Sequence, residues 1–216
     1  MVTTLYLVRH GETDSNIERR FQGRRDIPLN ENGRHQSELL GQAMKDCRID
    51  EIFSSYLARA KETAEKIACF HPEQSVTICP GLEEVDVGDV QGQYLDVIAK
   101  EMPELFRCMS EDQAHLQYPG GESCRDVYDR ITKTIARLVE QSRGKTIVVV
   151  SHGFAIQMYL HYASGKAFEE MGNYIVANTS RSKFLFEDGS VFPQTVYINR
   201  HDHLSADDFT EWKMEK

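Results

Sequence analysis

Short apolar runs and helical stripes alternate along the chain. Residues 4–8 and 146–150 are continuous apolar runs, and such continuity is typical of strands that are buried on both faces of a parallel sheet. Residues 51–55 and 75–79 are predicted as two further strands. Because helical patterns lie between these runs, the chain is predicted to form βα units. We therefore expect an α/β fold, with a mostly parallel open sheet that is flanked by helices on both faces.

Three stripes of apolar residues recur at helical spacing. They cover residues 30–47, 57–68 and 127–139, the first with a predicted start at Asn30. A fourth helix is expected after Gly153.

The C-terminal part of the chain predicts a hairpin. Residues 182–186 and 191–198 are its two strands, and Asp188-Gly189 is a turn signal. Pro193 weakens the second strand or places it at the edge of the sheet.

One stretch, about residues 80–121, follows neither pattern clearly. Inside it, two short helices are expected at residues 94–101 and 103–110. We take residues 1–216 as a single domain, with residues 93–118 as a candidate lid, a small helical insertion beside the site. A helix pair that packs on the core fits the same apolar residues equally well.

Composition and charge narrow the class of protein. The 216 residues are 40% apolar and 27% charged, which is ordinary for a soluble globular protein. The net charge of −9 disfavours non-specific binding to nucleic acid or to an anionic membrane, so a phosphate site would need a local concentration of positive charge. No apolar run is long enough to span a bilayer, and the first residues lack the basic region of a signal peptide. The five cysteines include no C-x-x-C, so we expect free thiols and a cytoplasmic protein.

Two predicted strands end in the same dipeptide, His-Gly. The motifs are R-H-G at 9–11 and S-H-G at 151–153. Ligands of open parallel sheets bind outside the carboxyl ends of the strands, so neighbouring strands would place His10 and His152 in one crevice. Arg9 offers a planar fork of donors suited to phosphate oxygens, and a neutral imidazole can act as a nucleophile. A single motif of this kind is more often only a turn, so the pattern indicates a phosphoryl site without establishing it.

Further polar residues fall at the same predicted edge of the sheet. Arg59 lies at a strand-to-helix junction, although an isolated helical arginine is usually just exposed. Glu83 and Glu84 open the irregular stretch, where a carboxylate could exchange a proton with a leaving oxygen, or where both could simply be solvated. His201-Asp202-His203 could be metal ligands, but without a second cluster a polar surface segment is favoured. Another group of arginines is interpreted mainly as a solvated face that pairs with Glu18 and Asp26, and partly as the pocket mouth: Arg19, Arg20, Arg24 and Arg25.

Taken together, the motifs resemble those of the histidine phosphatase superfamily, in the branch that includes cofactor-dependent phosphoglycerate mutases. The resemblance extends over nearly the whole chain, and the motifs come in the family's order. The matching pieces are L-V-R-H-G-E-T (7–13) with Asn16, R-F-Q-G (20–23), D-I-P-L-N-E-N-G (26–33), S-S-Y-L-A-R-A-K-E-T (54–63), L-E-E-V-D-V-G-D-V-Q-G (82–92), P-G-G-E-S (119–123) and V-V-V-S-H-G (148–153).

The resemblance implies a role for each matching residue. His10 corresponds to the nucleophile that accepts the phosphoryl group, and Glu84, which fits the L-x-E spacing better than Glu83, corresponds to the proton donor. No metal or cofactor is then needed, because fixed positive charge stabilises the transferring oxygens. We expect His10 to be neutral, with its other ring nitrogen donating to a backbone carbonyl, and His152 to be charged. The implied phosphate-binding residues are Arg9, Asn16, Gln22, Gly23, Arg59 and His152.

The resemblance covers both phosphatases and mutases. The mutases that the chain resembles carry a longer, more basic insertion, whereas residues 93–118 contain only Lys100 and Arg107 as cations. Our first hypothesis is a metal-independent phosphomonoester hydrolase that acts on small phosphorylated metabolites through a phosphohistidine. The alternative is a phosphoglycerate mutase-type transfer, which the G-x-x-Q-G form at 88–92 favours. In addition, Val90 stands where the family's phosphatases usually have an aromatic residue. A binding module is disfavoured, since no catalytic position is lost.

We expect a small phosphorylated substrate as the partner, with neither nucleic acid nor membrane, and a homodimer stays open.

Overall fold

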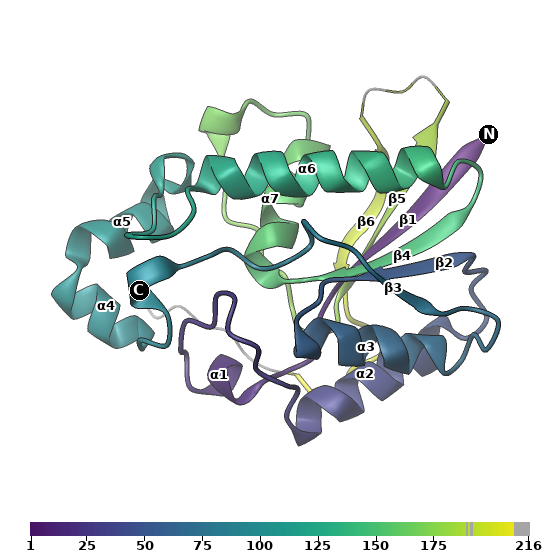
Figure 1. Ribbon diagram of the computed structural model, residues 1–216, viewed down its shortest axis with the longest axis horizontal. Coiled ribbons are helices and arrows are strands. Elements are labelled where there is room, and N and C mark those ends of the chain that lie inside the picture. The colour runs from purple at the N-terminus through teal and green to yellow at the C-terminus, as the bar shows by residue number, and fades with distance from the viewer. Residues whose placement is uncertain (189, 191, 210–216) are drawn as a thin grey trace.

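A six-stranded mixed sheet runs through the molecule in the order β3-β2-β4-β1-β5-β6 (Figure 1). The computed structural model describes residues 1–188, 190 and 192–209. Strands β3, β2, β4 and β1 pair in parallel, and β5 and β6 are antiparallel. The expected mostly parallel sheet is thus confirmed. The strands are β1 (Val2–Arg9), β2 (Glu51–Ser54), β3 (Val76–Ile78), β4 (Thr146–Ser151), β5 (Arg181–Glu187) and β6 (Gln194–Arg200).

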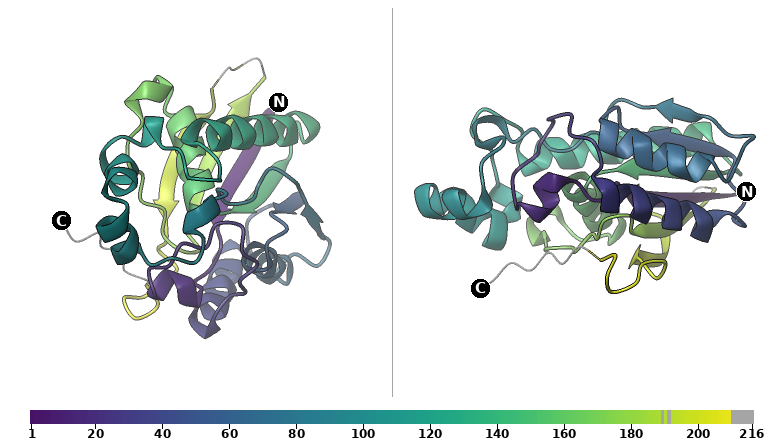
Figure 2. Two further views of the ribbon diagram at one scale, coloured as in Figure 1. Left: turned by 60° about the vertical axis from the view of Figure 1, so that its left-hand side comes forward. Right: turned by 90° about the horizontal axis from the view of Figure 1, so that it is seen from below.

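Helices cover both faces of the sheet, α6 and α7 on one face and α2 and α3 on the other (Figure 2). The helices α4 and α5 lie at the end of the molecule where the parallel strands have their carboxyl ends (Figure 1). The helices are α1 (Asp14–Ile17), α2 (Glu31–Met44), α3 (Ala58–Ala68), α4 (Leu95–Glu101), α5 (Pro103–Glu111), α6 (Cys124–Gln141) and α7 (Gly153–Ala163), with 3₁₀ turns η1 (Gly88–Val90), η2 (Gln113–His115) and η3 (Phe168–Glu170).

Strand β1 shows why a continuous apolar run was a correct signal for a central strand. Successive side chains of a strand point to opposite faces. Leu5 and Leu7 join the core cluster beneath α6 and α7, whereas Tyr6 and Val8 join the cluster beneath α2 and α3. Both faces are covered, so residues 5–8 all join one of the two core clusters.

The start of α2 is packed tightly against the loop that follows β1. Asn30 caps this helix as predicted, since its side chain accepts a hydrogen bond from the backbone N–H of Gly33 (2.8 Å). A Cβ atom at Gly33 would lie 2.0 Å from the backbone oxygen of Glu12. Only glycine therefore allows α2 to approach the loop that carries His10.

Some boundaries differ from the predicted ones. Helix α2 ends at Met44, before Cys47, and α1 has no apolar stripe that could have predicted it. Strand β6 begins at Gln194 and lies at the edge of the sheet, in agreement with the effect expected of Pro193. Residues 189 and 191, which belong to the predicted turn and strand, lie outside the described residues.

A search of the described helices finds none with the length and apolar content needed to cross a membrane.

Candidate active site

The two His-Gly motifs meet because the strands that precede them are hydrogen-bonded neighbours. Strands β1 and β4 pair in parallel with Arg9 opposite Ser151, and the backbone N–H of His10 donates to the carbonyl of Ser151 (3.1 Å). The next residue of each strand is a histidine, and the ring centroids of His10 and His152 lie 5.1 Å apart. The expectation that both imidazoles share one crevice is confirmed.

A hydrogen bond to the backbone determines which ring nitrogen of His10 is available. The Nδ1 atom lies 2.6 Å from the carbonyl oxygen of Gly11, which can only accept. The proton therefore sits on Nδ1, and Nε2 carries the lone pair. Burial, followed by the charges of Arg59 and Arg9, lowers the pKa of His10 well below its ordinary value. His10 is therefore neutral, as expected.

Two buried arginines supply the positive charge beside His10. The Arg59 guanidinium donates to the carbonyls of Gly23 (2.9 Å) and Arg25 (2.8 Å), and that of Arg9 donates to the carbonyl of Val176 (2.5 Å). Burial lowers the pKa of each to about 10, so both stay charged at neutral pH. Within the described part of the chain, the Nε atoms of both arginines lack hydrogen-bond partners. The guanidinium groups as a whole, which line the pocket, are suited to an anion with several oxygens.

His152 does not have the expected charge. Its ring is fully buried, and burial, Arg59, His10 and Arg9 lower the pKa of His152 well below its ordinary value. The expectation of a charged His152 is wrong for this pocket, since a third buried positive charge beside two guanidinium groups is unfavourable. Neither ring nitrogen has a hydrogen-bond partner among the described residues, but both nitrogens are fully buried, and His152 is not among the residues that line the pocket.

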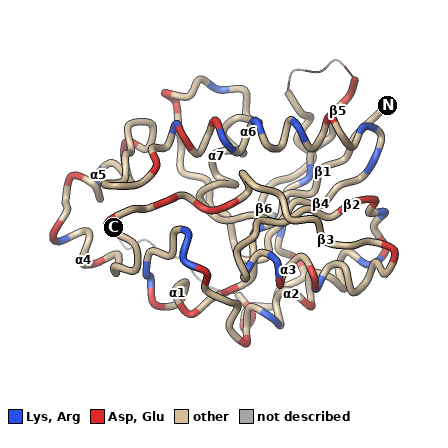
Figure 3. Tube along the Cα trace, viewed as in Figure 1, with Lys and Arg blue, Asp and Glu red and all other residues tan. Residues whose placement is uncertain are grey.

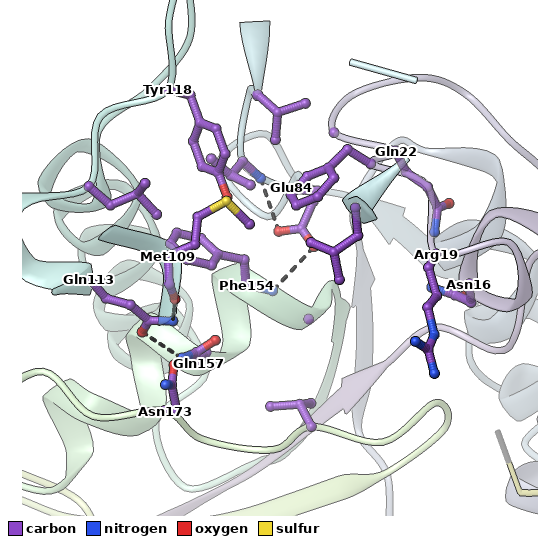
Figure 4. Close-up of a pocket in the computed structure, with 18 of the residues that line it drawn as sticks. Asn16, Arg19, Gln22, Glu84, Met109, Gln113, Tyr118, Phe154, Gln157 and Asn173 are labelled. Carbon is purple, nitrogen blue, oxygen red and sulfur yellow. Dashed lines mark hydrogen bonds between the residues drawn. The ribbon is translucent and has the colours of Figure 1, made fainter. Parts of the chain in front are cut away.

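The carboxylate of Glu84 is held at the N-terminus of α7. Its Oε2 atom accepts from the N–H of Phe154 (3.2 Å) and its Oε1 atom from the N–H of Ala155 (3.1 Å), as Figure 4 shows in part. These N–H groups have no partner within the helix, and they fix the position of the Glu84 side chain. Glu84 lines the pocket, whereas Glu83 accepts from the backbone N–H of Gly81 (2.7 Å) and does not line it. Of the two glutamates, only Glu84 is placed to act on a ligand in this pocket.

The remaining predicted phosphate-binding residues, unlike His152, line the pocket. Asn16 accepts from the backbone N–H of Thr13 (3.1 Å) through Oδ1, which leaves its Nδ2 group unused within the described residues. Gln22 and Gly23 are part of the same wall, and the φ of +52° at Gly23 turns its carbonyl toward Arg59.

The arginine cluster at 19–25 agrees partly with a solvated, ion-paired face and partly with a pocket mouth. The stretch lies beside α1 (Figure 3), and Arg19 and Arg20 line the pocket mouth. Arg20 also pairs with Glu18 (3.0 Å), as expected. Asp26 does not pair with the cluster, because it accepts from the backbone N–H of Ala58 at the start of α3 (2.6 Å).

The whole pocket, including its arginine end, has a volume of about 720 Å³ and mainly apolar walls. Residues 93–118, the candidate lid, supply part of this wall, including Phe106, Met109 and Tyr118. Several other residues of this segment, such as Leu105, pack against the core cluster, so lining and core packing occur together. Val90 is fully buried and is not among the residues that line the pocket.

The C-terminal His201-Asp202-His203 segment forms no metal site. No group of three or more His, Cys, Asp or Glu side chains within the described residues could hold a metal ion. Asp202 instead pairs with Arg181 (2.8 Å), and His203 bonds to Thr179 (3.0 Å). The segment is thus structural.

One part of the site was missed by sequence reasoning. Asn178 donates to the carbonyl of His10 through Nδ2 (3.1 Å), and Thr179 donates to it through its backbone N–H (3.3 Å). The stretch 177–180 is buried, but it has no periodic pattern and no motif. Its polar residues just before an apolar strand were the only available signal.

A buried histidine whose Nε2 carries the lone pair lies beside two buried arginines at the carboxyl edge of an α/β sheet. Such a site is typical of a class of phosphoryl-transfer proteins. The family model of the histidine phosphatase superfamily (branch 1) matches residues 5–199, and the chain belongs to this superfamily.

Individual relatives include both mutase-like and phosphatase proteins. A phosphoglycerate mutase-like protein of Arabidopsis thaliana is 35% identical over 197 residues, which is 89% of this chain and 84% of the relative. A solved phosphoserine phosphatase variant of Entamoeba histolytica, in complex with phosphoserine, has a TM-score of 0.83 at 28% identity and covers 94% of this chain and 100% of its own. A mycobacterial glucosyl-3-phosphoglycerate phosphatase has a TM-score of 0.82 at 27% identity, with 92% and 99% covered.

Proposed function

We propose that the protein is a metal-independent phosphomonoester hydrolase that acts on small phosphorylated metabolites through a phosphohistidine at His10. One observation carries the proposal: the Gly11 carbonyl fixes the Nδ1 proton, so Nε2 carries the lone pair in a pocket lined by two charged, buried arginines. Phosphoryl transfer depends mainly on positioning and on charge stabilisation, and this arrangement supplies both.

The reaction takes place in two steps. In the first, Nε2 of His10 attacks phosphorus, the ester P–O bond breaks, and protonated Glu84 gives its proton to the departing alkoxide. In the second, water attacks the phosphoimidazole, Glu84 takes a proton from that water, and inorganic phosphate leaves as the P–N bond breaks. Arg9 and Arg59 neutralise the equatorial oxygens in both steps. His152 and the Asn16 amide complete the phosphate site, together with Gln22 and the Gly23 loop.

A mutase is the second candidate. The similarity to a mutase-like plant protein and the G-x-x-Q-G form at 88–92 favour it. Against it, neither Lys100 nor Arg107 lines the pocket, and Arg107 is paired with Glu104 (3.1 Å). The candidate lid therefore offers no cation for a substrate carboxylate, and we propose that it acts as a wall and lid of a hydrolase.

We further propose a single domain, 1–216, in the cytoplasm, with no nucleic-acid or membrane partner. The free cysteines and the net charge of −9 support this proposal.

The test is a panel of phosphate esters scored for free phosphate with wild type, His10→Ala and the matched control His115→Ala. The His115 side chain is 75% exposed and does not line the pocket. The hydrolase would be supported by two results. In the presence of EDTA, wild type and His115→Ala should release phosphate and His10→Ala should release none, and rapid quench of wild type should capture an acid-labile adduct. Isomerisation of phosphoglycerates that depends on a bisphosphate primer, with little phosphate release, would establish the mutase instead.

A further inference from the structure

The wall of the pocket that lies across from Arg19, which we call the far wall, holds three side-chain amides. Gln113 lies in η2, Gln157 in α7 and Asn173 in the segment after η3, and Figure 4 shows the three together on one side of the pocket. Gln113 and Gln157 are each 9% exposed, whereas Asn173 is an exposed residue. Buried amides of this kind need hydrogen-bond partners, and the partners they have reveal which groups remain free.

Two backbone carbonyls determine how these amides are oriented. The Nε2 group of Gln113 donates to the carbonyl of Met109 (3.1 Å), and the Nδ2 group of Asn173 donates to the carbonyl of Ser110 (3.0 Å). Because a carbonyl only accepts, the side-chain oxygens of Gln113 and Asn173 must point the other way. Both oxygens face Gln157, whose Nε2 group donates to them at 2.7 and 3.4 Å.

The carbonyl oxygen of Gln157 is therefore the group left over. Both protons of its Nε2 are used, and its Oε1 atom accepts no hydrogen bond from the described residues. This oxygen also does not belong to the fully buried atoms that lack a partner, so it is accessible from the pocket that Gln157 lines. The far wall thus presents a fixed acceptor.

The rest of the far wall is apolar and uncharged. Every arginine that lines the pocket comes from residues 9–20 or from Arg59, and residues 95–118 and 153–176 contribute no cation. Their contribution is aromatic instead: the rings of Tyr118 and Phe154 lie 6.4 Å apart, edge to face. A carboxylate beside Gln157 would meet an acceptor oxygen, whereas a flat apolar ring would pack on the aromatic side chains.

We propose that the far wall of the pocket binds the alcohol part of the substrate as an uncharged ring with a hydrogen-bond donor, which donates to Oε1 of Gln157. The proposal rests on the proposed function, because the phosphoryl group of the same ester occupies the arginine end. A pocket of about 720 Å³ is ample for such an ester. The substrate class is thus a ring-bearing phosphomonoester, such as a nucleoside 5′-monophosphate, and not a three-carbon acid phosphate.

The experiment compares two esters that differ by one donor, 1-naphthyl phosphate and 5-hydroxy-1-naphthyl phosphate, together with 3-phosphoglycerate. We expect wild type to hydrolyse the hydroxy ester with a kcat/KM about fivefold to tenfold above that of 1-naphthyl phosphate, the net effect of one neutral hydrogen bond. We expect 3-phosphoglycerate to be the poorest of the three. In Gln157→Met, which keeps the length of the side chain, the ratio of the two naphthyl esters should fall to about one. The matched control is Gln42→Met, an exposed position on α2, which should keep the wild-type ratio.

Equal kcat/KM values for the two naphthyl esters in wild type, or a higher value for 3-phosphoglycerate, would overturn the proposal without any variant having to fold. An unchanged ratio in folded Gln157→Met would also overturn it. The proposed function fails in a different way, namely by the absence of phosphate release from all three esters and from p-nitrophenyl phosphate.

Discussion

The two buried imidazoles should make the folded state sensitive to mild acid. His10 and His152 both have pKa values well below 6.5 in the folded protein, mainly because of burial and secondly because of Arg59. In the unfolded chain both return to an ordinary pKa of about 6.5. Between that pH and their folded pKa values, only the unfolded chain takes up the two protons. Stability is therefore fully present above about pH 6.5 and is lost as the pH falls toward the folded pKa values.

The magnitude follows from this difference in proton uptake. A proton that is bound only by the unfolded state lowers the free energy of unfolding by up to about 1.4 kcal/mol per pH unit. For two imidazoles that stay neutral when folded, the loss between pH 7 and pH 5.5 is roughly 2–3 kcal/mol. This is a large part of the stability of an ordinary domain, which is roughly 5–15 kcal/mol.

Urea unfolding at pH 7 and pH 5.5, in buffers without phosphate or other oxyanions, measures this difference. The comparison is between wild type and the double variant His10→Asn/His152→Asn, which cannot titrate at these positions. The loss of unfolding free energy between the two pH values should be roughly 2–3 kcal/mol smaller in the double variant. His115→Asn is the control, because Asp112 raises the pKa of the exposed His115, so that its removal cannot make the acid loss smaller.

An equal loss of stability in wild type and in the double variant would refute the reasoning. So would an NMR titration of the folded protein that shows either ring protonated at pH 6.

Three further predictions concern single positions. Glu84→Gln should lower kcat by roughly 10²- to 10⁴-fold for alkyl phosphates, and much less for p-nitrophenyl phosphate, because the p-nitrophenolate leaving group needs no proton. Equal losses of kcat for both kinds of ester would show that Glu84 is not the proton donor. Gly33→Ala should lower the urea midpoint markedly, since the new Cβ would lie 2.0 Å from the backbone oxygen of Glu12, while Gly172→Ala, with nothing within 4 Å, should leave it nearly unchanged. Arg59→Lys should lower kcat/KM by at least tenfold, because an ammonium group cannot replace the planar fork that bonds to two backbone carbonyls; comparable phosphate-ester kinetics in both proteins would contradict this expectation.

Much of the scaffold is encoded locally. The apolar runs at 4–8 and 146–150 predict central strands, because a strand covered on both faces has no position for an exposed polar side chain. The residues that follow these runs were correctly placed in one crevice, since neighbouring parallel strands end at the same edge. The cap at Asn30 and the effect of Pro193 were correct for the same local reason. Nothing local announces α1, whose four residues carry no apolar stripe.

The charge within the site was not predictable in the same way. The sequence could place His152 beside two arginines, but the charge of its ring depends on complete burial and on the closeness of Arg59 and Arg9. Both quantities arise only when the strands and helices close over the pocket. The choice between Glu83 and Glu84 likewise depends on the tertiary structure, because the backbone N–H groups at the N-terminus of α7 bond to Glu84.

The sequence by itself therefore determined the α/β architecture, the edge where chemistry occurs, and the identity of the histidines and arginines there, because these depend on short-range patterning. Only the tertiary structure decided the neutral state of His152, the support of the His10 carbonyl by Asn178, and the accessible oxygen of Gln157. Each of these depends on groups that lie far apart along the chain, and no local pattern records their meeting.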